Sequence, residues 1–263
     1  MAGRASRIGA GALALMLVAA AWPWVAAARE AVGASRPTSA RPVVHSAPPC
    51  RRSAPTSAAG YAAMFAGVDP ARWGAADVAL SVPLPDGRVV WLFGDTLSTR
   101  RFVHSSAIVQ TGGCLHVSGG GSQLLPDADA THVYWISSAR VVAGGMNVTA
   151  REIELTGRGP WDFRDDGHDR VALVRVVGDD VEFARWLGRH ESAAPDPGPM
   201  IAIDPAHRHH FGYGRRPHPE AHLASGDVLV TTCQNWDDGR PHPFSAYRPL
   251  FSERPSGEAG RRP

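Results

Sequence analysis

The stretch Asp77–Thr96 constrains the fold of this chain more than any other part of the sequence. Large apolar residues alternate with smaller ones over Val78–Val82, which is typical of a strand with one buried face. The turn signal Pro85-Asp86-Gly87 follows, because proline presets φ and glycine accepts positive φ. Val89–Phe93 is β-branched and aromatic, so it suits a buried strand. The sequence therefore predicts a β-hairpin whose second strand ends abruptly at Gly94 and Asp95.

Turn signals separate further strand-like runs along the rest of the chain, and no long amphipathic helix interrupts them. Tyr61–Phe65 is the one short segment that fits either a helix or a first edge strand. The hairpin and the next two runs make four antiparallel strands in sequence, the content of one propeller blade. We expect an all-β fold, a small or degenerate five-bladed β-propeller, while a β-sandwich fits the same pattern. The further runs cover residues 102–110, 114–117, 133–142, 147–155, 170–177, 181–186, 200–203, 210–213, 217–223 and 228–236.

The two ends of the chain differ in composition from this β-rich part. Residues 1–28 have the features of a secretory signal peptide, with Arg4 and Arg7 before an apolar run and Ala26-Ala27-Ala28 as the cleavage site. A transmembrane anchor is the alternative for this run. Residues 29–59 are rich in Ala, Ser, Pro and Arg and are predicted to be a disordered linker. The propeller-like domain is expected over 60–251 and a disordered tail over 252–263.

Charge and cysteine content narrow the compartment and the partners. The formal net charge of +2 gives no electrostatic case for nucleic acid. We expect a secreted protein, extracellular or in the cell envelope, with no stable membrane anchor after signal cleavage. It is expected to be a monomer without a cofactor or a metal. Export permits a disulfide, for which Cys114 and Cys233 are the preferred pair, with Cys50 in the linker.

Carboxylates are the leading candidates for chemistry. Glycoside hydrolysis usually needs two of them, an acid and a base or nucleophile. Asp95 follows one predicted inner strand, and Glu220 starts another. Because the same end of each inner strand faces one mouth in a closed propeller, both are predicted to converge there. The alternative for Asp95 is that it only caps a turn.

Several other side chains could contact a sugar. His104 and His218 could face the same mouth, with His218 also able to tune Glu220. Trp161 and Trp236 each precede an acidic residue in a loop, and Asn235 adjoins Trp236. A strand-edge position for His104 and packing roles for the tryptophans are the alternatives.

Other catalytic arrangements have little support. The histidines of 207–210 could hold zinc, but no H-E-x-x-H pattern or paired cysteine spacing accompanies them. A serine nucleophile lacks its G-x-S-x-G turn. The acidic residues Asp162, Asp165, Asp166 and Asp169 could supply an orienting carboxylate, although a solvated turn is the simpler interpretation.

Two motifs resemble a known family. Trp91-Leu-Phe-Gly-Asp-Thr96 with Phe102-Val-His-Ser-Ser-Ala107 forms the first, and His218-Pro-Glu220 with Gly226–Asn235 forms the second. Together they resemble secreted actinobacterial proteins, formerly of unknown function, that are related to five-bladed propeller glycosidases and include endo-D-arabinanases. The resemblance implies that Asp95 is the nucleophile or base and Glu220 the acid. The chain departs from the family in being short for five full blades and in carrying Ser105 where many relatives have Asn.

The sequence therefore predicts a secreted glycoside hydrolase-like protein that acts on a furanose-containing, arabinan-type glycan through Asp95 and Glu220. A non-catalytic carbohydrate-binding or structural envelope propeller is the alternative. A hydrolase should hold both carboxyl groups in one mouth, roughly 5–5.5 Å apart for retention or 6.5–9.5 Å for inversion. A binding module should show aromatic faces without such a pair.

Overall fold

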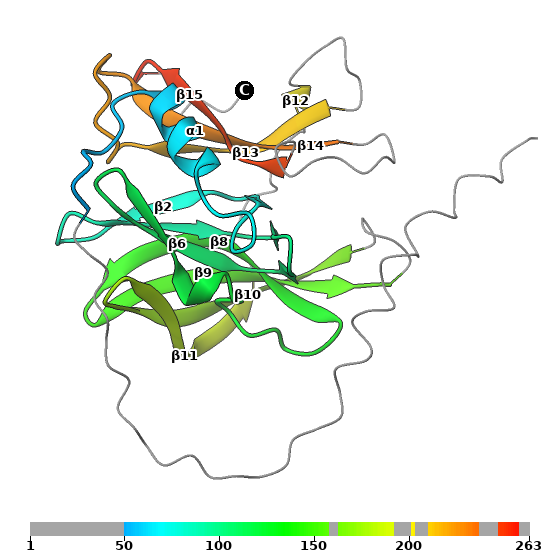
Figure 1. Ribbon diagram of the computed structural model, residues 1–263. Coiled ribbons are helices and arrows are strands. Elements are labelled where there is room, and N and C mark those ends of the chain that lie inside the picture. The colour runs from blue at the N-terminus through cyan, green and yellow to red at the C-terminus, as the bar shows by residue number, and fades with distance from the viewer. Residues whose placement is uncertain (1–49, 158–162, 192–200, 203–209, 237–246, 258–263) are drawn as a thin grey trace, which may run out of the picture. The chain divides into compact units, whose positions relative to one another are not determined.

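The computed structural model of the protein describes residues 50–157, 163–191, 201–202, 210–236 and 247–257. Within these ranges the chain forms one α-helix, α1 (Ala58–Ala66), one 3-10 turn, η1 (Ser118–Gly120), and otherwise strands and loops, so the fold is all-β (Figure 1). The Ser57 hydroxyl caps α1 by accepting a hydrogen bond from the Gly60 N–H. The element expected around Tyr61 is thus a helix rather than an edge strand.

The first four-stranded sheet confirms the hairpin predicted from the opening stretch. Gly87 makes the turn with a φ of 86°, and its N–H donates to the Leu84 carbonyl at 3.0 Å. The first strand begins two residues later than expected, because Val78 and Ala79 adopt left-handed φ values of 70° and 48°. The antiparallel order is β2 (Leu80–Pro83), β3 (Val89–Phe93), β6 (Ser106–Thr111) and β7 (Cys114–Val117).

The second sheet contains two hairpins, residues 132–155 and 163–191, which the sequence predicts as separate runs. Residues Met146–Ala150 pair with Arg170–Val174 and connect the hairpins edge to edge. This joining depends on pairing between strands of different hairpins, which the alternation within each strand does not specify. The strands, in spatial order, are β8 (His132–Val142), β9 (Gly145–Leu155), β10 (Phe163–Val177) and β11 (Asp180–Glu191).

The third sheet corrects the expected position of Glu220. Strand β13 (His210–His218) is continuous and ends at His218, so Glu220 lies in the turn after a strand rather than at the start of one. Pro219 has no N–H to continue the ladder, and the Ala221 N–H closes the turn onto the His218 carbonyl at 3.1 Å. The other strands are β12 (Ile201–Ala202), β14 (Val228–Trp236) and β15 (Leu250–Arg254), in the order β12-β13-β14-β15.

A small three-stranded sheet lies at the end of the first hairpin. Its order is β1-β4-β5, with β1 (Ala75–Ala76), β4 (Thr96–Leu97) and β5 (Phe102–Val103). Ala76 pairs with Thr96, and Thr96 with Val103. The sheet therefore brings together the residues just after β1, just before β4 and just after β5.

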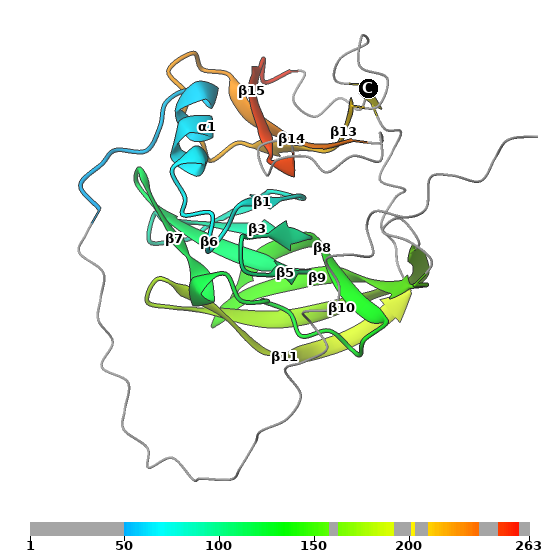
Figure 2. The ribbon, with the colours of Figure 1, turned by 45° about the vertical axis from the view of Figure 1, so that its right-hand side comes forward.

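The first sheet buries both of its faces. Side chains alternate along a strand, so Val90 packs in one core cluster with Tyr134, and Trp91 packs in the other with Phe65 and Leu229. Trp91 is 1% exposed, which confirms that Val89–Phe93 is a buried strand at this position. Both ribbon views place α1 beside β15 (Figures 1 and 2), where it helps close the second cluster.

The cysteine pairing differs from the expected one. Cys50 and Cys114 form the disulfide, and Cys233 is free and buried. The segment after Cys50 lies against the turn before β7, where the Gly113 N–H donates to the Arg52 carbonyl at 2.8 Å. A Cβ on Gly112 would lie 2.4 Å from the same carbonyl oxygen, so a glycine is needed for this approach. Residues 50–59 are therefore held by a disulfide, backbone hydrogen bonds and the start of α1 instead of forming a loose linker.

The described part of the chain thus contains three four-stranded antiparallel sheets, each in sequence order, and one three-stranded sheet. Five complete four-stranded blades are not present within it. Strand β15 runs to Arg254, past the boundary expected at residue 251. None of the described helices has the length and apolar character needed to cross a membrane.

Candidate functional site

Asp77 and Asp95 lie opposite each other where the small sheet continues beyond β1 and β4. The Asp77 N–H donates to the Asp95 carbonyl, and the Gly94 N–H donates to the Asp77 carbonyl, both at 3.2 Å. Ala76 pairs with Thr96 before this point and Leu80 with Leu92 after it, in the same register, so Asp77 lies opposite Asp95. The negative charge of Asp95 acts on the Asp77 carboxyl group, so the two acids form an interacting pair.

Asp95 is held by two ring nitrogens. The Trp135 Nε1–H donates to Asp95 Oδ1 at 3.1 Å, and His104 Nδ1 lies 3.0 Å from the same oxygen. Burial disfavours protonation of His104, but its hydrogen bond and charge interaction with Asp95 outweigh that effect and raise the pKa of His104. Asp95 itself stays partly exposed, with 21% of its side-chain surface accessible. The predicted neighbours Asp95 and His104 are thus brought together, with Trp135 added to them.

Asp77 has two very different carboxyl oxygens. Its Oδ2 accepts hydrogen bonds from the Tyr213 hydroxyl at 3.0 Å and the Tyr247 hydroxyl at 2.9 Å. Its Oδ1 is buried and has no hydrogen-bond partner among the described residues. Burial, followed by the charge of Asp95, raises the pKa of Asp77 to about 7, and the two tyrosine hydrogen bonds only partly oppose this. Because Oδ2 already accepts two bonds, the proton belongs on Oδ1.

The backbone around Asp77 is shaped to hold this position. A Cβ on Gly94 would lie 2.4 Å from Asp77 Oδ1, so only glycine leaves room for the carboxyl group. Val78 and Ala79, immediately after Asp77, both have positive φ. Such a conformation costs a β-branched residue about 1–3 kcal/mol and is retained where the surrounding structure enforces it.

His218 is a structural residue in this fold, not a sugar contact. It is fully buried, with Nδ1 2.5 Å from the Ser81 hydroxyl and Nε2 2.7 Å from the Thr231 hydroxyl. Burial, assisted by the charge of Arg216, lowers the pKa of His218 to about 3. Both ring nitrogens are therefore engaged inside the protein, and the prediction that His218 faces a substrate mouth is wrong.

Glu220 lies away from Asp95. Its Oε1 is 3.7 Å from His218 Nδ1, and its charge acts on Tyr61 of α1. His218 contacts Ser81, which pairs with Trp91, and Trp91 precedes Asp95 by four residues. The structure therefore supplies Asp77, rather than Glu220, as the carboxyl group next to Asp95.

The remaining predicted residues divide into two groups. Trp161 and the histidines of 207–209 lie outside the described residues, as do the side chains of Asn235 and Trp236 at the end of β14. The acidic residues of β10 form ion pairs, Asp165 and Asp169 with Arg151 and Asp166 with Arg189. These three aspartates therefore lie in a strand and form ion pairs instead of the expected solvated turn, and Asp169 is buried. Asp162 lies outside the described residues. Within the described residues, no group of three or more His, Cys, Asp or Glu side chains could hold a metal ion.

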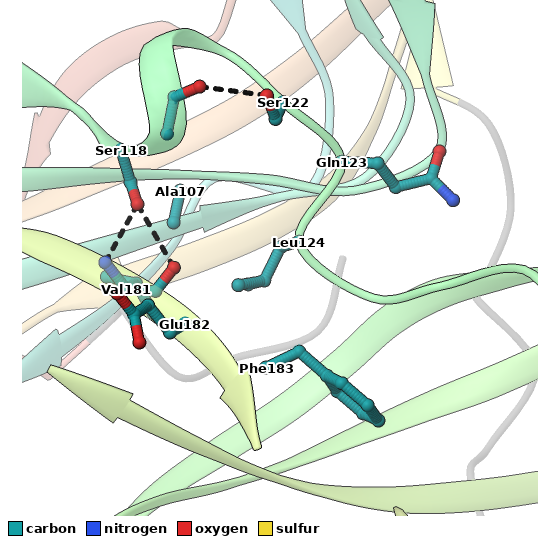
Figure 3. A pocket seen from close by; sticks show the side chains of 9 residues that line it. Ala107, Ser118, Ser122, Gln123, Leu124, Val181, Glu182 and Phe183 are labelled. Carbon is teal, nitrogen blue, oxygen red and sulfur yellow. Dashed lines mark hydrogen bonds between the residues drawn. The ribbon is translucent and has the colours of Figure 1, made fainter. Parts of the chain in front are cut away.

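A pocket of about 230 Å³ lies near this site but does not contain it (Figure 3). In its wall, the Ser118 hydroxyl is bonded to the backbone of Val181 (Figure 3). Gln123 lines the pocket, and its Oε1 accepts a hydrogen bond from the backbone N–H of His104 at 3.2 Å. Because the ring of His104 contacts Asp95, Gln123 links the pocket wall to the carboxylate pair. The residues that line it are Ala107, Ser118, Gly119, Ser122, Gln123, Leu124, Val181, Glu182 and Phe183.

Comparisons with known proteins identify no family for this chain. No family model matches it, and no curated protein matches it. Among solved structures, the chain is similar to a Bacteroides ovatus protein provisionally named as a hydrolase, with a TM-score of 0.40 and 13% sequence identity. The match covers 73% of this chain and 60% of the other, so the chain spans less than two thirds of that neighbour.

Sequence reasoning missed Asp77, Tyr213, Tyr247 and Trp135 as members of the site. Asp77 follows a two-residue strand, which is too short to show any periodicity. Tyr213 and Tyr247 reach Asp77 from 136 and 170 residues away in the sequence. The available signal was an aspartate at each end of the first hairpin, since such residues meet when the hairpin closes.

Proposed function

We propose that this protein is a secreted glycoside hydrolase that cleaves a furanose-containing, arabinan-type glycan with Asp77 and Asp95. The observation that carries the proposal is the asymmetry of this pair. Asp77 is buried and keeps its proton up to about pH 7, whereas Asp95 is partly exposed and held by His104 and Trp135. Two acids whose surroundings separate their roles are the arrangement that glycoside hydrolysis requires.

In the proposed reaction, Asp77 is the general acid. Its Oδ1 is buried in the substrate-free protein, so the proposal requires that substrate binding opens access to this atom. The Oδ1 proton then passes to the glycosidic oxygen while the bond from that oxygen to the anomeric carbon breaks. The unused hydrogen-bonding capacity of Oδ1 favours this oxygen as the donor, because Oδ2 is occupied by Tyr213 and Tyr247. Asp95 acts at the anomeric carbon as the nucleophile, or as the base that takes a proton from the attacking water.

Four other residues position the pair in this proposal. Tyr213 and Tyr247 fix the orientation of Asp77, and His104 and Trp135 fix that of Asp95. A protonated His104 also forms an ion pair with Asp95. These contacts come from the small sheet, from β8 and β13 and from the segment before β15, so the site depends on the whole fold.

The substrate class, the location and the fold family belong to the same proposal. The motifs around Asp95 and Glu220 resemble those of propeller proteins that include endo-D-arabinanases. The three sequential four-stranded sheets are suited to act as propeller blades. Residues 1–28, outside the described residues, carry the features of a cleaved export signal.

Release of oligosaccharides from arabinan and arabinogalactan tests the proposal. Wild type, Asp77→Asn, Asp95→Asn and Glu220→Gln should be compared, with folding checked by thermal melting. We expect release by wild type and by Glu220→Gln, and a loss of about 10²-fold or more in both aspartate variants. Release that survives in Asp95→Asn would overturn the proposal, whereas sugar binding without any release would support a non-catalytic binding protein.

A further inference from the structure

Exposed aromatic rings gather around the residues that hold Asp95. Among the large hydrophobic residues that the structure describes, six are exposed, and only two of these are aromatic, Phe102 at 49% and Phe163 at 40%. The other four are aliphatic: Val141, Val177, Leu187 and Leu250. Exposing a large aromatic ring to water costs free energy, so two such rings beside one site indicate a binding surface.

Each exposed phenylalanine contacts a residue that is bonded to Asp95. The Phe102 ring lies 4.9 Å from the His104 ring with an interplanar angle of 89°. The Phe163 ring lies 4.6 Å from the Trp135 ring with an angle of 70°. Phe102 belongs to β5 and Phe163 to β10, so two separate sheets bring aromatic rings to the same carboxylate.

The geometry of these contacts leaves aromatic surface free. Two nearly perpendicular rings touch edge to face, so at least one face of each phenylalanine is not covered by its partner. Such a face matches the C–H surface of a sugar ring, which is apolar although the ring's hydroxyl groups are polar. Phenylalanine carries no charge, so this surface suits a neutral glycan.

We propose that Phe102 and Phe163 are the stacking platforms for the sugar units on either side of the bond that Asp95 attacks. This inference rests on the proposed function and adds the side chains that bind the substrate. His104 and Trp135 then have two tasks, since each holds Asp95 and also supports a platform. A glycan chain lying across the two rings is thereby placed over the exposed side of Asp95.

Binding measurements separate this inference from the proposed chemistry. Arabino-oligosaccharides should be titrated calorimetrically into Asp77→Asn protein, which retains both platforms but should not cleave the ligand. Phe102→Ala and Phe163→Ala should each weaken binding about 3- to 10-fold, whereas Phe102→Tyr and Phe163→Tyr should restore it. Leu187→Ala and Leu250→Ala remove comparably exposed apolar side chains and are the matched controls.

The same variants in the wild-type background should raise KM more than they lower kcat. If sugar binds and the phenylalanine variants weaken it, but wild type releases no product, the inference holds and the proposed hydrolysis fails. If wild type cleaves the glycan and both alanine variants bind it as tightly as the leucine controls, the inference fails and the hydrolysis stands. If no sugar binds to the protein, both are overturned.

Discussion

At the scale of single residues, the site depends on one oxygen atom of Asp77 that has no hydrogen bond and another that has two. Asp77 Oδ2 is fixed by Tyr213 and Tyr247, while Oδ1 lies against Gly94. Burial and the neighbouring charge of Asp95 raise the pKa of Asp77, and the asymmetry places its proton on Oδ1. The raised pKa of Asp77 and its close contact with Gly94 each lead to a measurable prediction.

The raised pKa of Asp77 makes the free energy of unfolding depend on pH. Because burial and Asp95 raise this pKa to about 7, the native protein binds the proton more tightly than the unfolded chain does. The group's stabilising effect is fully present below the unfolded pKa of about 4 and is lost as pH rises to about 7. Asp77→Asn cannot titrate, so its stability relative to wild type should increase between pH 4 and pH 7, by at most about 4 kcal/mol.

Urea unfolding of both proteins at pH 4, 5.5, 7 and 8 measures this difference. The asparagine keeps an oxygen that can accept from the tyrosines, so the variant is expected to fold. A difference in the free energy of unfolding that stays constant from pH 4 to pH 8 would show that Asp77 is not perturbed.

Gly94 should be needed for activity because of its contact with Asp77. A methyl group at this position would lie 2.4 Å from Asp77 Oδ1 and must displace the carboxyl group. Gly94→Ala should therefore lower kcat at least about 10-fold with a smaller change in KM. Gly188→Ala in β11 is the matched control, since a Cβ there meets nothing within 4 Å. Equal kcat values in the two variants would argue against a catalytic role for Asp77.

At the scale of secondary-structure elements, the chain before α1 is part of the fold. The Cys50–Cys114 disulfide closes a span of 64 residues and ties this segment to β7. The Glu253 carboxylate of β15 also accepts from the Ala58 N–H at 2.8 Å, which fixes the start of α1. Helix, disulfide and last strand therefore support one another.

The disulfide should contribute strongly to stability. Closing a loop of this length lowers the entropy of the unfolded chain and stabilises the fold by about 4 kcal/mol. Cys50→Ser should lower the free energy of unfolding by about 2–4 kcal/mol. The unreduced protein should also yield a peptide pair linked through Cys50 and Cys114. A linked pair that contains Cys233 would contradict this account.

Strand positions were more predictable from the sequence than strand partners. Alternation and turn residues located β2, β3 and the β8–β9 hairpin, because these signals act within a few residues. The joining of β9 to β10 was not predictable, since it depends on long-range pairing. The disulfide was misassigned because the composition before residue 59 suggested disorder. The close approach of Arg52 and Ser53 to Gly112 and Gly113, which places Cys50 beside Cys114, is visible only in three dimensions.

At the scale of the whole molecule, the sequence located two of the six residues of the candidate site. Asp95 and His104 were identified by the abrupt end of an apolar strand and by a motif, and the structure places them in contact. Glu220 was chosen on the expectation that inner strands converge in a closed ring. The structure places Glu220 beside His218 and Tyr61 instead, while Asp77 reaches Asp95 through two-residue strands that are too short to show periodicity.

The pH dependence of kcat/KM on arabino-oligosaccharides tests the central claim most directly. If Asp77 is the acid, kcat/KM of wild type should fall above about pH 7, and Asp77→Asn should be slower by about 10²- to 10⁴-fold and lack this decrease. His104→Gln is the control, because its profile should keep the decrease if the proton comes from Asp77. An Asp77→Asn enzyme that retains both the rate and the decrease above pH 7 would contradict the account.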